Sequence, residues 1–282
     1  MNDFPIKVCA MASGRHDQKR VADLVRRFPD KDSIPPKEEH YRRLFMANGS
    51  TKEAEFQQLL SALPDPVPLK EILDGVKTNL VDHPAALLGE VGLDRSFRIA
   101  FQPLPAPPPR KLSPFSVPID HQIAILEAQL DLAVELQRNV SLHSVGSQQV
   151  TMDLLKRMHE KHGARWRAIS IDLHSCGISL EGWKTIEGCA EDRLLVESDY
   201  DKIECSVSQT WKMIEVIASL REWEIETSWA EEEPPLENWG VVRRLKRNWL
   251  RFQAGGHPEI VQKSRRLRKQ HQYYPSDESE EE

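Results

Sequence analysis

The feature of this sequence that most constrains its fold is one acidic residue inside an apolar run, residues 87–94, LLGEVGLD. The run predicts a buried strand, and it places Glu90 between Gly89 and Gly92. A carboxylate in apolar surroundings costs free energy unless it is paired with a positive group or binds a metal ion. Glu90 therefore needs a partner from elsewhere in the chain.

Three later apolar runs end in side chains that could share a cation with Glu90. VSLHS contains His143, SIDLHS contains His174, and LLVESD contains Glu197 and Asp199. Carboxylate oxygen and imidazole nitrogen are ligands that zinc, manganese and magnesium use in hydrolytic sites. A parallel barrel presents such groups at the carboxyl ends of its strands. We therefore predict an α/β fold of TIM-barrel type with a site for one or two divalent metal ions, Mg, Mn or Zn.

Composition narrows the class of protein. With 282 residues, of which 39% are hydrophobic, the chain can bury a sizeable core, and we expect one large domain. The net charge of −6 argues against a global positive field that would recruit nucleic acid, so a nucleic acid substrate would need a local patch or a metal ion. The four cysteines form no CxxC pair and no long apolar span occurs, which predicts a reduced protein of the cytoplasm or nucleus, without membrane insertion.

Hydrophobic periodicity gives the order of the elements. Short apolar runs predict five of the eight strands that a closed barrel needs, at residues 6–12, 87–92, 140–143, 169–174 and 194–198. Apolar residues at helical spacing predict helices at residues 17–26, 40–46, 69–80, 119–138, 150–158, 180–189, 207–220 and 238–252. The sequence thus predicts an incomplete barrel.

Two segments are expected to lie outside the core of a domain that spans residues 1–253. Residues 99–118 are rich in proline, which predicts an extended surface insertion. Residues 254–282 pass from the basic run KSRRLRK to the acidic run SDESEEE, which predicts a disordered tail. The basic run could serve as a nuclear address or contact phosphate.

The motifs GEVGLD, LHS, LHS and VESD, in this order, resemble those of the TatD family of metal-dependent hydrolases, and of its fungal branch in particular. The resemblance covers residues 6–15 and 65–252. It implies a TIM-barrel deoxyribonuclease that cleaves phosphodiesters with two divalent ions. By this likeness Glu90 would bridge the two ions, His143 and His174 would complete the ligands of one, and Asp199 would bind the other and handle the attacking water.

The sequence also departs from the family pattern. It contains no His-x-His pair, which the family carries on its first strand, and Asp199 stands only 25 positions after His174, where the family has a further strand and helix. Three hypotheses remain open: a weakened, mononuclear hydrolase that acts on DNA, a catalytically inactive relative that serves as the partner of another protein, and a hydrolase of small amides or esters.

Overall fold

The computed structural model describes residues 35–46, 51–102, 110–174, 189–199, 203–229 and 234–257. The predicted strand at 6–12 and the predicted helix at 17–26 lie outside these residues, as do most of the predicted helix at 180–189 and the tail from residue 258 onward.

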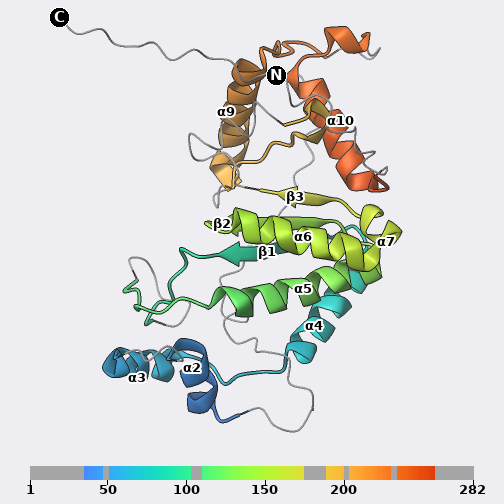
Figure 1. Ribbon diagram of the computed structural model, residues 1–282. Helices are drawn as coiled ribbons and strands as arrows, with labels where there is room; N and C mark the ends of the chain where they lie inside the picture. The colour runs from blue at the N-terminus through green and yellow to red at the C-terminus, as the bar shows by residue number, and fades with distance from the viewer. Residues whose placement is uncertain are drawn as a thin grey trace, which may run out of the picture.

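The centre of the described structure is a parallel sheet with the strand order β1-β2-β3. Helices connect consecutive strands, α5 between β1 and β2, and α6 with the short α7 between β2 and β3 (Figure 1). The bounds are β1 (Leu88–Asp94), α5 (Ile119–Leu136), β2 (Val140–Val145), α6 (Gln148–His162), α7 (Ala164–Arg167) and β3 (Ile171–Leu173). This alternation of strand and helix is the unit from which parallel barrels are built, and it confirms three of the predicted strands and the helices between them.

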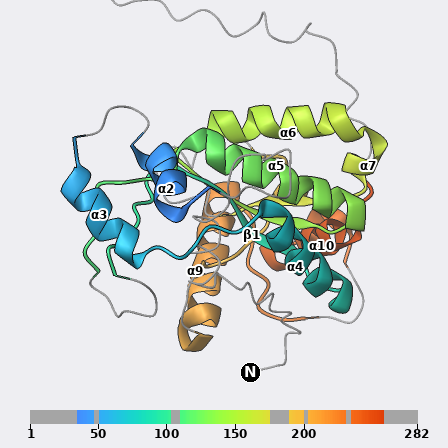
Figure 2. The same cartoon turned by 90° about the horizontal axis from the view of Figure 1, so that it is seen from below.

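The main core lies between the sheet and the helices α4 (Leu69–Asp82), α5 and α6. Figure 2 shows α5 and α6 side by side, and residues of both pack on the apolar face of the sheet. The side chains at its centre have no exposed surface, and they come from both strands and helices: Leu93, Leu130, Leu142, Leu154 and Met158. Burial of these side chains is the main free-energy gain that holds the strands to the helices.

A bulge in β1 separates the apolar face of that strand from its polar face. From Leu88 to Val91 the chain advances three residues, whereas the paired strand β2 advances only two, from Val140 to Leu142. The extra residue lets Leu88 and Val91 both face the helices, although a regular strand would turn them to opposite faces. Glu90, between them, is left on the side of the sheet away from this core.

A second core differs from the prediction of a surface insertion at residues 99–118. Within the described part of this segment, Phe101 and Phe115 are buried, and they pack with Tyr41 of α2 and Phe56 of α3. The two arms of the segment pair through backbone hydrogen bonds, including one from Phe101 N to Lys111 O. The helix α3 was not predicted, while α2 agrees with the predicted helix at 40–46. Their bounds are α2 (Lys37–Phe45) and α3 (Glu53–Ala62).

The C-terminal helices pack together beyond β3, whereas α2 and α3 lie at the opposite end of the molecule (Figure 1). These helices, α9 (Ile203–Arg221) and α10 (Val241–Ala254), confirm the last two predicted helices. The 3-10 turns nearby are η1 (Glu191–Arg193) and η2 (Leu236–Asn238).

The predicted strand at 194–198 is wrong, because these residues belong to no sheet of the described structure. The carbonyl oxygen of Leu194 accepts a hydrogen bond from the Asn248 side chain of α10, at 2.8 Å, instead of one from a neighbouring strand. The described chain therefore has three strands in one sheet.

We expect the main core to respond strongly to truncation. Leu130→Ala should lower the free energy of unfolding by about 2–5 kcal/mol, because Leu130 is fully buried between α5 and the sheet and its loss leaves a cavity. Urea titration followed by circular dichroism measures the change. The matched control is Leu250→Ala on α10, where the leucine is 49% exposed and the loss should stay below about 1 kcal/mol. Equal losses in both variants would contradict this account of the core.

Candidate metal centre

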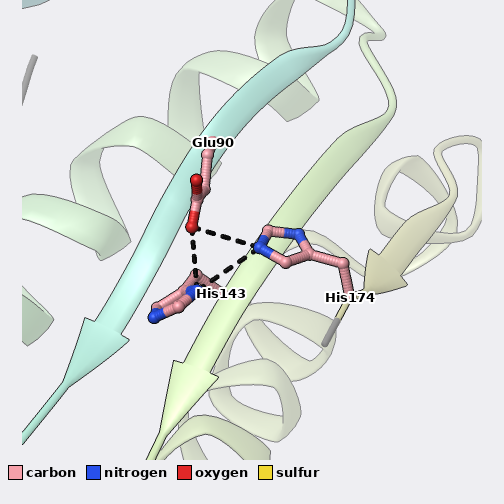
Figure 3. A group of neighbouring side chains, drawn as sticks. All are labelled: Glu90, His143 and His174. Atoms are coloured by element: carbon pink, nitrogen blue, oxygen red, sulfur yellow. Dashed lines mark hydrogen bonds and ion pairs between the residues drawn. The ribbon is translucent and has the colours of Figure 1, made fainter. Parts of the chain in front are cut away.

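Glu90, His143 and His174 meet on the side of the sheet away from the main core (Figure 3). Glu90 comes from β1, His143 from β2, and His174 directly follows β3. Successive side chains of a strand point to opposite faces, so the burial of Leu142 against the helices turns His143 to the other side. β1 and β2 thus each provide one of the four predicted ligands, and the residue directly after β3 provides another, because the parallel pairing brings these three positions side by side.

One atom from each side chain converges on a single point. Oε1 of Glu90 lies 2.8 Å from Nδ1 of His143 and 3.1 Å from Nε2 of His174. The two imidazole nitrogens lie 3.4 Å from one another. Atoms that bind one metal ion at ~2.1 Å lie about 3.0–3.4 Å apart, depending on whether the geometry is octahedral or tetrahedral. Two of the three distances lie in this range and the third, between Glu90 and His143, is about 0.2 Å shorter, so the three atoms are placed close to where the ligands of one divalent ion would lie.

The two glycines that flank Glu90 allow β1 and β2 to approach each other at this point. A Cβ atom on Gly92 would lie 2.0 Å from the carbonyl oxygen of His143, a distance that no real contact reaches. A Cβ atom on Gly89 would lie 3.0 Å from Cβ of Ser141. A side chain at either position would push the strands apart, so the glycines of GEVGLD keep Glu90 within reach of His143.

The charges of the three side chains support one another. Hydrogen bonds with His143 and His174 hold the pKa of Glu90 well below its ordinary value. The hydrogen bond with Glu90 raises the pKa of His143. Burial lowers the pKa of His174, but the hydrogen bond and the charge of Glu90 outweigh it, and the pKa is raised. A cation, either a proton on an imidazole or a metal ion, is therefore favoured beside Glu90.

Polar residues that the sequence analysis missed surround the two imidazoles. Ser141 Oγ lies 2.9 Å from Nδ1 of His174, and Oδ2 of Asp94 lies 3.7 Å from Nε2 of His143. Asp172 hydrogen-bonds Ser141. Ser141 and Asp172 each stand two residues before a ligand histidine on the same strand, so the alternation of side chains in VSLH and SIDLH is the signal that could have found them.

Asp199, the fourth predicted ligand, is not part of the group that could hold a metal ion among the described residues. Its negative charge nevertheless contributes to the raised pKa of His143, so it lies within electrostatic range of the site. Glu197 acts in the same way on Asp172 and raises its pKa. The structure thus brings three of the four predicted ligands into contact and places Asp199 in their surroundings.

Comparison with known proteins gives the family. The model of the family described as "TatD related DNase" matches residues 64–231, more than half of the chain. The chain belongs to the TatD-related DNase family. This membership, together with the parallel sheet, confirms the predicted fold class. The chain has an α/β structure of the TIM-barrel-like metallohydrolase type.

Two individual TatD-related proteins illustrate the likeness. The protein named Cut9-interacting protein scn1, of the fission yeast Schizosaccharomyces pombe, is 34% identical over 160 residues, which cover 49% of this chain and 48% of that protein. The chain thus spans about half the length of this relative. The crystal structure of YJJV, a TatD homologue from Escherichia coli K12, has 18% sequence identity and a TM-score of 0.41, with 66% of this chain and 70% of that chain covered.

The charges at the site predict a pH dependence for the metal-free protein. Histidines whose pKa rises on folding stabilise the protein below pH 6.5, their ordinary pKa, and this contribution is lost as the pH rises through the folded-state pKa. The free energy of unfolding, measured by urea titration in the presence of a chelator, should therefore fall as the pH rises above about 6.5. The fall should be smaller in Glu90→Gln, which lacks the carboxylate. Parallel pH profiles for the two proteins would contradict the pairing of Glu90 with the histidines.

Proposed function

We propose that this chain is a divalent-metal-dependent hydrolase that cleaves phosphodiester bonds in DNA, with Glu90, His143 and His174 as the ligands of one ion. The observation that carries the proposal is the convergence of three ligand atoms within 3.4 Å of one another from three neighbouring strands. The membership of the TatD-related DNase family supports phosphodiesters as the substrate class.

The proposed reaction assigns a role to each side chain. A divalent ion held here would neutralise charge on the phosphate and make water a better nucleophile. Glu90 stays ionised, and its negative charge would help to hold the cation in the site. Asp199 would take the proton from the attacking water, since its negative charge acts on His143. The water oxygen bonds to phosphorus, the ester bond breaks, and the leaving oxygen takes a proton from solvent.

The three ligand atoms favour a single zinc or manganese ion. Two imidazole nitrogens and one carboxylate oxygen suit zinc or manganese better than magnesium, which prefers oxygen ligands. We therefore propose a mononuclear site with Zn²⁺ or Mn²⁺, and Asp199 as a further acid available to a second ion.

Removal of Glu90 should abolish cleavage. Glu90→Ala should lower the rate on DNA with Mn²⁺ or Zn²⁺ by at least about 100-fold, because loss of a ligand costs more than the ~10–100-fold that loss of a surrounding partner costs. The measurement is release of fragments from labelled DNA by the purified protein. The control is Glu71→Ala, which removes an exposed glutamate from α4 and should leave the rate unchanged.

Equal cleavage by the wild type and Glu90→Ala would rule out this function for the site. A panel of small esters and amides, tested with the same two proteins, separates the DNA hydrolase from a hydrolase of small substrates. Turnover of an ester that depends on Glu90, without turnover of DNA, would keep the metal site and replace the substrate class.

A second candidate function is that of an interaction protein. The similar fission yeast protein is named for an interaction with Cut9. We propose that this chain has a corresponding protein partner, a Cut9-like protein, and that the contact does not depend on the metal site. In calorimetric titrations with a purified Cut9-like protein, wild type and Glu90→Ala should bind with affinities within about twofold of one another. Absence of binding by both proteins would remove this candidate.

The cell compartment is part of the same proposal. The basic run at residues 263–269 supports the nucleus, and the cytoplasm is the other compartment we propose. No described helix combines the length and the hydropathy that a membrane span requires.

A further inference from the structure

Ser141 and Asp172 form a chain of polar contacts behind His174, on the side away from Glu90. Ser141 is 1% exposed, and its hydroxyl lies 2.9 Å from Nδ1 of His174, while Nε2 of the same ring lies 3.1 Å from Glu90. Asp172 is the next group along this line, because it pairs with Ser141 across β2 and β3 and its carboxylate interacts with the Ser141 side chain. The line thus runs from Glu90 through His174 and Ser141 to Asp172.

The hydroxyl of Ser141 suits both states that the site would adopt. Without a metal ion, a neutral His174 donates its Nε2 proton to Glu90, and Nδ1 accepts the hydroxyl proton of Ser141. With a metal ion on Nε2, the ring carries its proton on Nδ1. This N–H group donates a hydrogen bond, and the Ser141 hydroxyl oxygen must accept it. A hydroxyl can turn from donor to acceptor, and its own proton then needs a new acceptor.

Asp172 provides that acceptor. It lies in β3 two residues before His174, so both side chains point to the same side of the sheet. Burial raises the pKa of Asp172, and the nearby charge of Glu197 adds to this, whereas His174 and Ser141 oppose it. A partly buried carboxylate costs free energy unless it accepts hydrogen bonds. A hydrogen bond from the Ser141 hydroxyl would lower this cost and explains why the Asp172 carboxylate lies here.

We propose that Ser141 and Asp172 are positioning residues for the metal centre, and that they hold His174 in the tautomer whose Nε2 binds the ion. The inference rests on the proposed metal-dependent function. It is distinct from that function, because Ser141 and Asp172 are not among the three side chains that could hold the ion. Outer partners of this kind fix the orientation and tautomer of a histidine ligand, and their loss costs about 10–100-fold in metal affinity.

The first test is Ser141→Ala, with Zn²⁺ affinity measured by calorimetric titration of the full chain. We expect the affinity to fall by about 10–100-fold. The matched control is Ser170→Ala: Ser170 is 2% exposed and lies next to β3, but its hydroxyl bonds His257 instead of His174. The control should bind Zn²⁺ as the wild type does. Equal affinity in Ser141→Ala and Ser170→Ala would overturn the inference.

The second test reads the tautomer directly. Long-range ¹H–¹⁵N NMR correlations of His174, assigned by comparison with His174→Gln, should show a single state with the proton on Nδ1 in the Zn²⁺-loaded wild type, whereas loaded Ser141→Ala should show a second state with the proton on Nε2. A single state with the proton on Nδ1 in both proteins would overturn the inference. A role of Ser141 in packing alone would not move this signal.

The third test uses Asp172 and stays informative if Ser141→Ala fails to fold. Asp172→Asn keeps an oxygen that can accept the Ser141 proton, so its Zn²⁺ affinity should stay within about threefold of the wild type. Asp172→Leu, of similar size, removes the acceptor, and its affinity should fall by about 10-fold or more. Equal affinities in these two variants would count against the role of Asp172.

The outcomes separate this inference from the proposed function. If the wild type binds Zn²⁺, Glu90→Ala does not, and Ser141→Ala binds like the wild type, only the positioning role fails. If the wild type binds no Zn²⁺, or Glu90→Ala binds it equally well, the metal centre itself fails and the positioning role with it.

Discussion

The parallel pairing of β1 with β2 is the constraint on which the rest of the described structure depends. It sets the distance from Glu90 to His143, and it can form only because Gly92 leaves room for the backbone of His143. The same pairing holds Leu93 and Leu142 together against the helices. The burial of apolar side chains on one face therefore stabilises a costly group of charges on the other face.

Much of the central fold and of the site could be predicted because two simple signals agree there. Apolar runs of strand length alternate with apolar residues at helical spacing, and a charged or imidazole side chain interrupts each strand run at Glu90, His143 and His174. The support around the site was not predicted. Ser141 and Asp172 are ordinary polar residues in sequence; the alternation in VSLH and SIDLH places each on the side of a ligand histidine, but the contact of Ser141 with His174 depends on the pairing of the strands.

The remaining failures have physical causes. Prolines suggested that residues 99–118 lie on the surface, but the flanks of this segment carry Phe101 and Phe115, which pack with aromatic side chains far away in sequence. The run at 194–198 has the composition of a strand, yet the carbonyl oxygen of Leu194 accepts a hydrogen bond from the Asn248 side chain and not from a neighbouring strand. Contacts between distant segments decided both regions, and such contacts leave no local pattern in the sequence.

The bulge in β1 has a consequence for how such a protein can diverge. Because the extra residue between Leu88 and Val91 separates the orientation of the carboxylate from that of its apolar neighbours, the two sides of one strand are free to change independently. Mutations that change the apolar core under the helices need not disturb the metal centre, and a protein that loses the metal centre can keep the fold. A single irregularity in one strand thus allows the core and the site to diverge separately.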